Sequence, residues 1–423
     1  MKYFKTVLIL ISCLFYLIPT NVWTLNFIFE SQPFSFQALR AIGYCFSGGA
    51  DVGECLYTCY QIKDGDTESW YDQWYSTANR VLAMGDHYME TMNVENAREC
   101  YFRASQYFRT AEFYLHSNPQ DPRIMETWFE SKDAFLLAAS LPGHPIIPMK
   151  IPFEDSYLPG YLCLVDESAA KRPMIIAHSG FDGTKEELYF SIGNYAVNRG
   201  YNCLLFEGPG QGEVIREQNI HFRPDWETVV TPVVDYIIDR PYVDRDKIVL
   251  IGYSMGGYFA PRAVAYEHRI AACVANGGLY SMYAVATSDN EDNIDQILDD
   301  PEASQQYDQT IYSMMENDLF LEWFFTNGMW AFHADSPSEL MRMLRSYTLE
   351  GCVGNISCPM LILDSENDDQ NMGQAKVLYD SLKCPKEYVL FTELEGADEH
   401  CQMGAVLVSN EKIFSWLNEV LNQ

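Results

Sequence analysis

Lys247-Ile-Val-Leu-Ile-Gly-Tyr-Ser-Met-Gly-Gly-Tyr258 is the most informative stretch of this 423-residue chain. Its uninterrupted apolar run, Ile248 to Ile251, predicts a buried strand. The next residues match G-x-S-x-G, and a helix-compatible run follows them. A strand that turns this sharply into a helix strains its serine, and a Cβ on either flanking glycine would collide with backbone. The stretch therefore predicts a nucleophile elbow that holds the Ser254 hydroxyl at a helix N-terminus, rather than an incidental serine in a glycine-rich turn.

The pattern around this stretch alternates strands with helices from residue 146 to the C-terminus. Strands are expected at 147–153, 157–165, 174–177, 203–206, 248–251, 270–275, 360–363 and 388–391, and helices at 186–199, 226–240, 374–382 and up to about 421. This alternation predicts an α/β fold, with a mostly parallel sheet covered by helices on both faces.

Residues from about 279 to 350 break the alternation, because they are helical and rich in methionine and aromatic side chains. An insertion between two late strands lies above the strand ends that carry catalytic loops. We therefore expect a helical lid. Its aromatic side chains pack it onto the core, line the pocket, or do both.

The N-terminal part has a different pattern. Amphipathic periodicity predicts helices at 68–84, 94–115 and 121–139, whereas residues 30–66 look irregular and rich in turns. We therefore expect a small helical domain at 30–145, with aromatic residues in its core, packed on the α/β part at 146–423.

The first residues resemble a targeting segment. Lys2 and Lys5 precede an apolar run from Val7 to Ile18, which is short for a transmembrane span. We expect residues 1–24 to be a signal peptide cleaved near Thr24, or else an uncleaved N-terminal anchor. Either reading predicts a secreted or periplasmic protein.

Composition excludes several partners. The formal net charge of −31 disfavours nucleic acid and anionic lipid, so a membrane is expected only through an uncleaved N-terminal segment. No C-x-x-C pair or cysteine/histidine cluster occurs among the twelve cysteines, so no metal and no other cofactor is expected. Export would permit disulfides, but neither their pairing nor a homodimer can be read from the sequence.

A serine nucleophile needs a histidine base and an acid, and on this fold the chain order is serine, acid, histidine. Of eight histidines, only His400 follows the last strand. Asp364, Glu366, Asp368 and Asp369 follow the strand at 360–363 and compete for the acid. Aligning Ser365 with the glycine of the usual h-G-x-x-D pattern favours Asp368, with Asp369 as the alternative.

The oxyanion hole requires two N–H donors. We expect them to come from Met255, which follows the nucleophile, and from Phe181 in the loop His178-Ser-Gly-Phe-Asp-Gly183. A second glycine-rich turn, 207–212, lacks the residues of a phosphate loop and is interpreted as shaping a loop beside the pocket.

These motifs together resemble the α/β-hydrolase superfamily. The resemblance rests on Gly180-Phe-Asp-Gly-Thr-Lys-Glu-Glu187, Gly208-Pro-Gly-Gln-Gly212, Gly252-Tyr-Ser-Met-Gly-Gly257 and Gly396-Ala-Asp-Glu-His-Cys-Gln402. Within the superfamily, the chain is similar to the branch of 2,6-dihydropseudooxynicotine hydrolase and the fungal polyketide-shortening hydrolases of pigment synthesis. It is also similar to hydrolases of the dipeptidyl aminopeptidase and acylaminoacyl-peptidase type.

The resemblance implies a Ser254/Asp368/His400 triad that acts on an ester or on a carbon–carbon bond beside a ketone. The substrate would be a small apolar molecule with an acyl or aryl carbonyl group. Two other functions stay open at this point: a peptidase of the dipeptidyl or acylaminoacyl type, and a binding protein without catalytic activity on the same fold.

Overall fold

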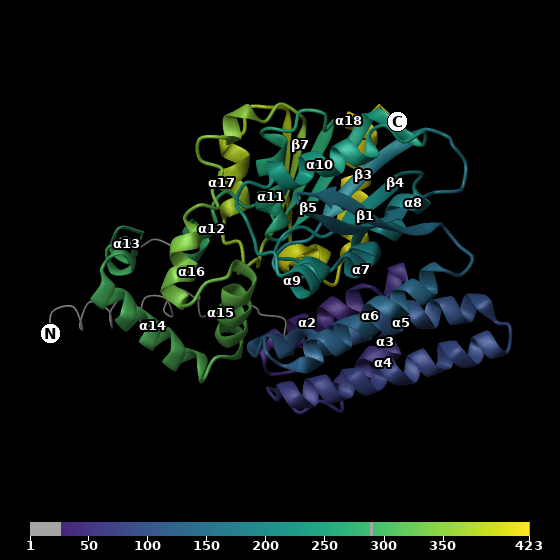
Figure 1. Ribbon diagram of the computed structural model, residues 1–423, viewed down its shortest axis with the longest axis horizontal. Coiled ribbons are helices and arrows are strands. Elements are labelled where there is room, and N and C mark those ends of the chain that lie inside the picture. Colours follow the sequence, from purple (N-terminus) through teal and green to yellow (C-terminus); the bar gives the residue numbers. More distant parts are fainter. Residues whose placement is uncertain (1–26, 288–290, 423) are drawn as a thin grey trace.

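The structure is a computed structural model that describes residues 27–287 and 291–422 (Figure 1). The expected signal peptide at 1–24 lies outside the described residues and stays a prediction. Within the described ranges, no helix is both long enough and apolar enough to cross a membrane.

An eight-stranded sheet forms the centre of the molecule, in the order β1-β2-β4-β3-β5-β6-β7-β8. The hairpin strands β1 and β2 are antiparallel to their neighbours, and every pairing from β4 to β8 is parallel. The strands are β1 (Ile146–Phe153), β2 (Ser156–Cys163), β3 (Arg172–His178), β4 (Asn202–Phe206), β5 (Val243–Tyr253), β6 (Ala272–Asn276), β7 (Met360–Ser365) and β8 (Lys386–Phe391). The mostly parallel sheet predicted from the sequence is confirmed.

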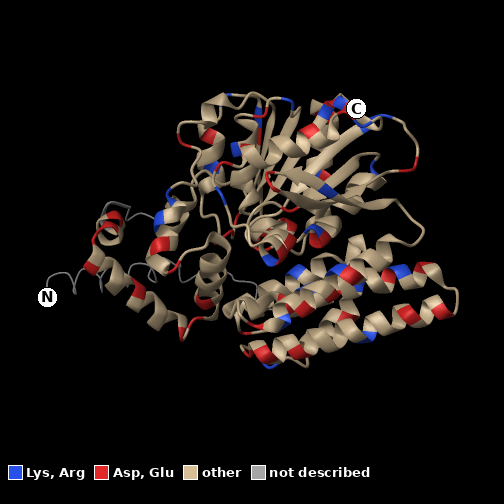
Figure 2. Ribbon diagram, viewed as in Figure 1, with Lys and Arg blue, Asp and Glu red and all other residues tan. Residues whose placement is uncertain are grey.

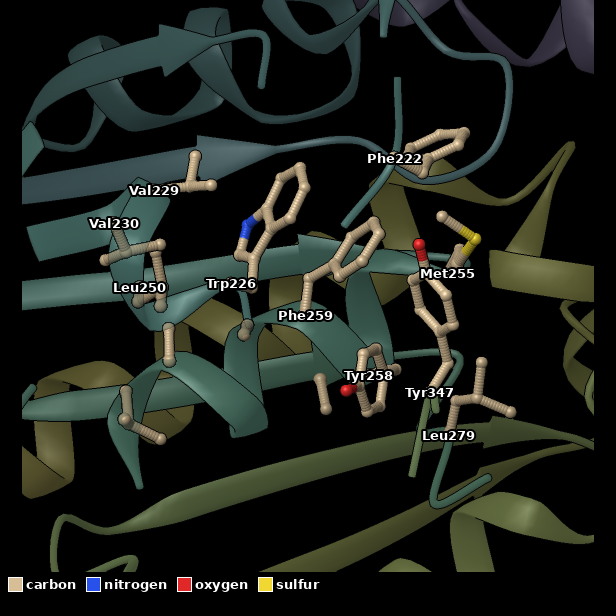
Figure 3. Packing of buried hydrophobic residues seen from close by; sticks show 14 of the residues in the cluster. Phe222, Trp226, Val229, Val230, Leu250, Met255, Tyr258, Phe259, Leu279 and Tyr347 are labelled. Atoms are coloured by element: carbon tan, nitrogen blue, oxygen red, sulfur yellow. The ribbon is translucent and has the colours of Figure 1, made fainter. Parts of the chain in front are cut away.

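Helices cover both faces because successive strand residues point to opposite sides. In β5, Ile248 and Leu250 belong to one core, whereas Val249 and Ile251 belong to another. The first core lies under α10 (Glu227–Ile237), α11 (Gly256–Val264) and α17 (Gln374–Ser381), and the second lies under α8 (Asn194–Asn198) and α18 (Val406–Val420). Figure 3 shows part of the first core, where the rings of Trp226 and Phe259 stack 3.8 Å apart.

The helix predicted at 186–199 is not continuous. It consists of α7 (Lys185–Leu188), a π-helical turn (Tyr189–Gly193) and α8. The turn is fully buried, and its Tyr189 and Phe190 rings pack against the N-terminal helices. In this wider π-helical turn, both large rings point toward the N-terminal helices.

The N-terminal helices lie side by side below the sheet in Figure 1. They are α2 (Gln32–Gly43), α3 (Val52–Cys59), α4 (Thr67–Glu90), α5 (Val94–Glu112), the 3₁₀ turn η2 (Phe113–Ser117) and α6 (Pro122–Ala139). The expectation that residues 30–66 are irregular was wrong, because α2 and α3 occupy much of this range. Both helices are short. Helix α2 also buries the polar residues Ser35, Gln37 and Arg40 beside its apolar residues, so its sequence shows no continuous apolar stripe.

Between β6 and β7, the described residues form five α-helices and a short 3₁₀ turn (Val353–Asn355); residues 288–290 are not described. The α-helices are α12 (Met282–Thr287), α13 (Glu291–Asp299), α14 (Pro301–Met315), α15 (Leu319–Phe332) and α16 (Pro337–Leu344). α15 reaches the N-terminal helices: the ring of Trp323 stacks on Phe113 at 4.5 Å, and its Nε1–H donates to the Phe113 carbonyl at 3.0 Å. The insertion and the N-terminal helices therefore meet directly.

Acidic residues occur on the N-terminal helices, the insertion and the sheet-bearing part alike (Figure 2). The negative charge is thus distributed over the chain. All eleven cysteines in the described ranges are free thiols.

Candidate active site

Ser254 occupies the sharp turn between β5 and α11. Its backbone is left-handed, with φ of 58°, and its N–H donates to the carbonyl of Asn276 at 2.9 Å. A Cβ on Gly252 would lie only 2.0 Å from the carbonyl oxygen of Gly256, so the turn requires glycine there. The strained serine and the steric need for glycine, both predicted from G-x-S-x-G, are present in the structure.

One hydrogen-bonded chain joins the three residues proposed from the sequence. The Nε2 atom of His400 lies 2.8 Å from Ser254 Oγ, and its Nδ1 atom lies 2.8 Å from both carboxylate oxygens of Asp368. The side chains of His400 and Asp368 are buried. Asp368, rather than Asp369, therefore faces the imidazole.

The loops after β7 and β8 hold the acid and the histidine in register. The backbone N–H and side-chain amide of Asn367 donate to the carbonyl and carboxylate of Asp398, at 2.9 and 2.8 Å. Asp368 Oδ1 also accepts two backbone N–H groups, from Gln370 and Asn371. These bonds fix the carboxylate before any substrate binds.

The surroundings of His400 favour its protonated form. Burial acts to lower the pKa of His400, but the charge and hydrogen bond of Asp368 and the neighbouring Cys401 outweigh burial and raise this pKa well above its usual value. The imidazolium that forms when a serine loses its proton would thus be stabilised.

The loop after β3 lies directly against the elbow. A Cβ on Gly180 would be 2.6 Å from the Met255 nitrogen, so only glycine allows this approach. Within the described residues, neither the Met255 nor the Phe181 amide donates a hydrogen bond. Gln211, in the glycine-rich turn 207–212, donates to the carbonyls of Ser179 and Gly180 at 2.7 and 3.0 Å, so this turn supports the loop after β3.

A cavity of about 360 Å³ opens beside Ser254 and His400. Helix α2, η2 and the start of α15 form much of its wall. The residues that α2 contributes are Gln32, Pro33, Phe36, Gln37 and Arg40, and Tyr44 lines the cavity just after the end of the helix. The sequence interpretation missed this wall because it assigned no helix to residues 30–66, although Ser31-Gln-Pro33 is a helix-start signal.

Buried ion pairs tie the N-terminal helices to the loop that carries Phe181. Arg40 of α2 binds both oxygens of Glu187 at 2.6 Å and Asp182 at 2.8 Å, and Arg109 of α5 binds Asp182 at 2.6 Å. Burial alone would raise the pKa values of Asp182 and Glu187, but the two arginines hold both below their usual values. The carboxylates are therefore ionised and paired.

His178, the other histidine near a strand end, lies in the interior of the protein. It is fully buried beside Trp226, and burial lowers the pKa of His178 to about 4, so the ring is neutral at physiological pH. In the described part of the chain, no group of three or more potential ligands could hold a metal ion.

Comparison with known proteins shows the family of this chain. A model of the alpha/beta hydrolase family matches residues 174–408. A hydrolase of a Fusarium species, LUC6, is 34% identical, and the match covers 93% of this chain and 97% of that protein. The 20-hydroxy-prefusarin hydrolase FUS2 of Gibberella moniliformis is 32% identical over 92% of this chain and 97% of its own.

Among solved structures, 2,6-dihydroxy-pseudo-oxynicotine hydrolase is similar in fold. Its TM-score is 0.70 at 21% identity, over 90% of this chain and 95% of that one. The chain belongs to the alpha/beta hydrolase family, and it is a hydrolase enzyme. The fold class and the family resemblance predicted from the sequence are both confirmed.

Proposed function

We propose that this protein is a serine hydrolase that cleaves a carbonyl compound, either an ester or a carbon–carbon bond beside a ketone. The observation that carries the proposal is the unbroken hydrogen-bonded chain from Asp368 through His400 to Ser254. Each member has the partner that its role requires: a nucleophile beside a base, and a base oriented by an acid.

In the proposed reaction, Ser254 Oγ attacks the carbonyl carbon while His400 Nε2 takes its proton. Asp368 holds the imidazole in the required tautomer and stabilises its positive charge. The amides of Met255 and Phe181 donate to the oxyanion, and each contributes about 3 kcal/mol by analogy with other hydrolases. His400 then gives its proton to the leaving alcohol or enolate carbon, and water releases the acyl group from Ser254 by the reverse steps.

The cavity supports an apolar organic substrate. Its wall contains the aromatic side chains of Phe36, Phe113, Phe320 and Trp323. Such a surface favours an acyl or aryl group over a charged one. The relative named for 20-hydroxy-prefusarin, which matches nearly the whole chain, also supports a small organic substrate.

The proposal is tested by labelling the folded protein with a fluorophosphonate probe. We expect strong labelling of the parent protein and none of Ser254→Ala or His400→Ala. The matched control is Ser409→Ala, a buried serine whose hydroxyl donates only to the Val406 carbonyl, and labelling should persist in it.

A screen of esters, β-diketones and aminoacyl amides then separates the candidate activities. Turnover of esters or diketones that depends on Ser254 would support the proposal. Turnover of aminoacyl amides alone would favour a peptidase, and a folded protein that neither reacts with the probe nor turns over any substrate would favour a binding role.

A further inference from the structure

Gln211 joins the glycine-rich turn 207–212 to the loop after β3. Its side chain is buried, with the residue only 2% exposed. The Oε1 atom accepts the N–H of Gly208 at 2.9 Å, and Nε2 donates to the carbonyls of Ser179 and Gly180, at 2.7 and 3.0 Å. One buried amide therefore bonds to both segments.

The orientation of this amide is fixed by its partners. A backbone N–H can only donate, so the atom that faces Gly208 is the amide oxygen of Gln211. Carbonyl oxygens can only accept, so the atom that faces Ser179 and Gly180 is the amide nitrogen, whose two hydrogens match the two carbonyls. A flipped amide would lose all three bonds.

One of the two carbonyls belongs to the peptide group that joins Gly180 to Phe181. The carbonyl and the N–H of a trans peptide group lie in one plane and point in opposite directions. The bond from Gln211 to the Gly180 carbonyl therefore also sets the direction of the Phe181 N–H. Within the described residues this N–H donates no hydrogen bond, and it is the one that the proposed reaction assigns to the oxyanion.

A hydrogen bond to a peptide carbonyl also strengthens the N–H of the same peptide group as a donor. Bonds in such a chain polarise one another, and the effect is larger in a buried, weakly dielectric environment. A donor that already has its final direction needs no reorganisation when negative charge develops on the substrate oxygen. Gln211 thus has two ways to act on the oxyanion without touching it.

The turn that carries Gln211 is held closely against the core. A Cβ on Gly208 would lie 2.6 Å from the Trp226 ring, and a Cβ on Gly210 would lie 2.3 Å from the Phe222 ring. Both rings belong to the core that Figure 3 shows. Glycine lets the backbone approach these rings, and the packed turn gives the amide of Gln211 a fixed base.

We propose that Gln211 is a positioning residue of the oxyanion hole: by donating to the Gly180 carbonyl, it orients and polarises the peptide group whose N–H, that of Phe181, binds the oxyanion. The inference rests on the proposed function, since it takes Phe181 as one of the two donors. Gln211 itself does not contact the substrate, so its effect falls on the chemical step rather than on substrate binding.

The test compares Gln211→Met and Gln211→Glu with the parent protein on a p-nitrophenyl ester whose turnover depends on Ser254. Methionine has a similar length and loses all three bonds. Ionised glutamate keeps an oxygen for the Gly208 N–H but cannot donate to the two carbonyls. Both variants should lose about 10- to 100-fold in kcat/KM, somewhat less than when an oxyanion donor is removed outright. If Gln211→Met does not fold, Gln211→Glu decides.

A second readout separates positioning from a general disturbance of the cavity. Ser254 Oγ adds to the carbonyl carbon of a trifluoromethyl ketone and forms an oxyanion, whereas a methyl ketone of the same chain binds largely as the intact ketone. In both Gln211 variants, the inhibition constant of the trifluoromethyl ketone should rise about 10- to 100-fold, and that of the methyl ketone by less than about threefold. The pH–rate profile should keep its shape, because the contacts of His400 are unchanged.

The controls make the same two changes at other glutamines. Gln106, on α5, is also 2% exposed, and Gln218 is the last residue of α9 (Gly212–Gln218), the helix that starts beside Gln211. Neither is among the residues that line the cavity. Gln106→Met and Gln218→Glu should therefore keep kcat/KM and both inhibition constants within about threefold of the parent values.

Equal kcat/KM values for the parent and both Gln211 variants would overturn the inference. So would a loss confined to Gln211→Met, because glutamate keeps the bond within the turn and lacks only the two donations. An equal rise in both inhibition constants would also overturn it, since the whole cavity would then be disturbed. Absence of any turnover that depends on Ser254 in the parent protein would instead contradict the proposed function.

Discussion

Asp368 and Asp369 are neighbours on the loop after β7, yet only Asp368 bonds to the imidazole of His400. Asp369 is exposed, and partial desolvation together with the charge of Asp368 raises the pKa of Asp369. The sequence alone left four acidic candidates in this loop. The choice of Asp368 depended on aligning Ser365 with a motif glycine, and the bond itself depends on loop conformations that no local pattern specifies.

Replacement of Asp368 tests this assignment through pH. The base must be neutral to act, so kcat/KM should fall as the pH drops through the raised pKa of His400. Asp368→Asn removes the charge that stabilises the imidazolium, so the acidic limb should move to lower pH. The rate should also drop by about 10⁴-fold, as expected when the imidazole is held in the wrong tautomer.

The matched variant is Asp369→Asn, which removes a carboxylate from the same loop without breaking a bond to His400. It should keep most of the activity. The pH–rate profile of all three proteins on one p-nitrophenyl ester provides the measurement. If Asp369→Asn caused the larger loss, Asp368 would not be the triad acid.

At the scale of elements, apolar periodicity could be read wherever a helix or strand buries only an apolar face. This is why α4 to α6 and all eight strands were found from the sequence. Helix α2 was missed for the opposite reason: Gln37 faces a cavity and Arg40 faces carboxylates, so the apolar stripe is broken where the helix meets the site. The apolar stripe of α2 is therefore interrupted at the residues that line the cavity and pair with the loop after β3.

The contact of α2 with the loop after β3 predicts a large effect on stability. Arg40 is buried, and Arg40→Met would leave Arg109 as the remaining ion-pair partner of Glu187 and Asp182. Uncompensated buried charge should lower the free energy of unfolding by about 3 kcal/mol or more. Urea denaturation at neutral pH measures this loss.

An exposed ion pair provides the comparison for Arg40. Arg245 pairs with Asp239 on the surface, with side chains 60% and 76% exposed. Arg245→Met should change the free energy of unfolding by less than about 1 kcal/mol. Equal stability of the two variants would show that the buried pairs do not hold α2 to the loop.

At the scale of the whole molecule, α5 and α6 contribute side chains to the hydrophobic core on one face of the sheet, in addition to the separate core that the N-terminal helices form among themselves. Phe102 of α5 stacks on Tyr189 at 5.0 Å, and Phe135 of α6 stacks on Tyr161 of β2 at 4.7 Å. All four rings are buried in the same cluster as the strands of the sheet. A boundary near residue 145, which the change of sequence pattern predicts, therefore separates two kinds of structure that bury their side chains together.

A shared core predicts that the molecule unfolds as one unit. Scanning calorimetry should show a single transition. Phe102→Ala, which removes a fully buried ring, should move the whole transition to lower temperature, at a cost of about 3–5 kcal/mol.

Phe46→Ala is the matched control, since its ring is 78% exposed, and it should leave the transition in place. Two separate transitions, of which Phe102→Ala moved only the first, would mean that residues 146–423 fold without the helices that wall the cavity. The sequence-based boundary would then also be a boundary of stability.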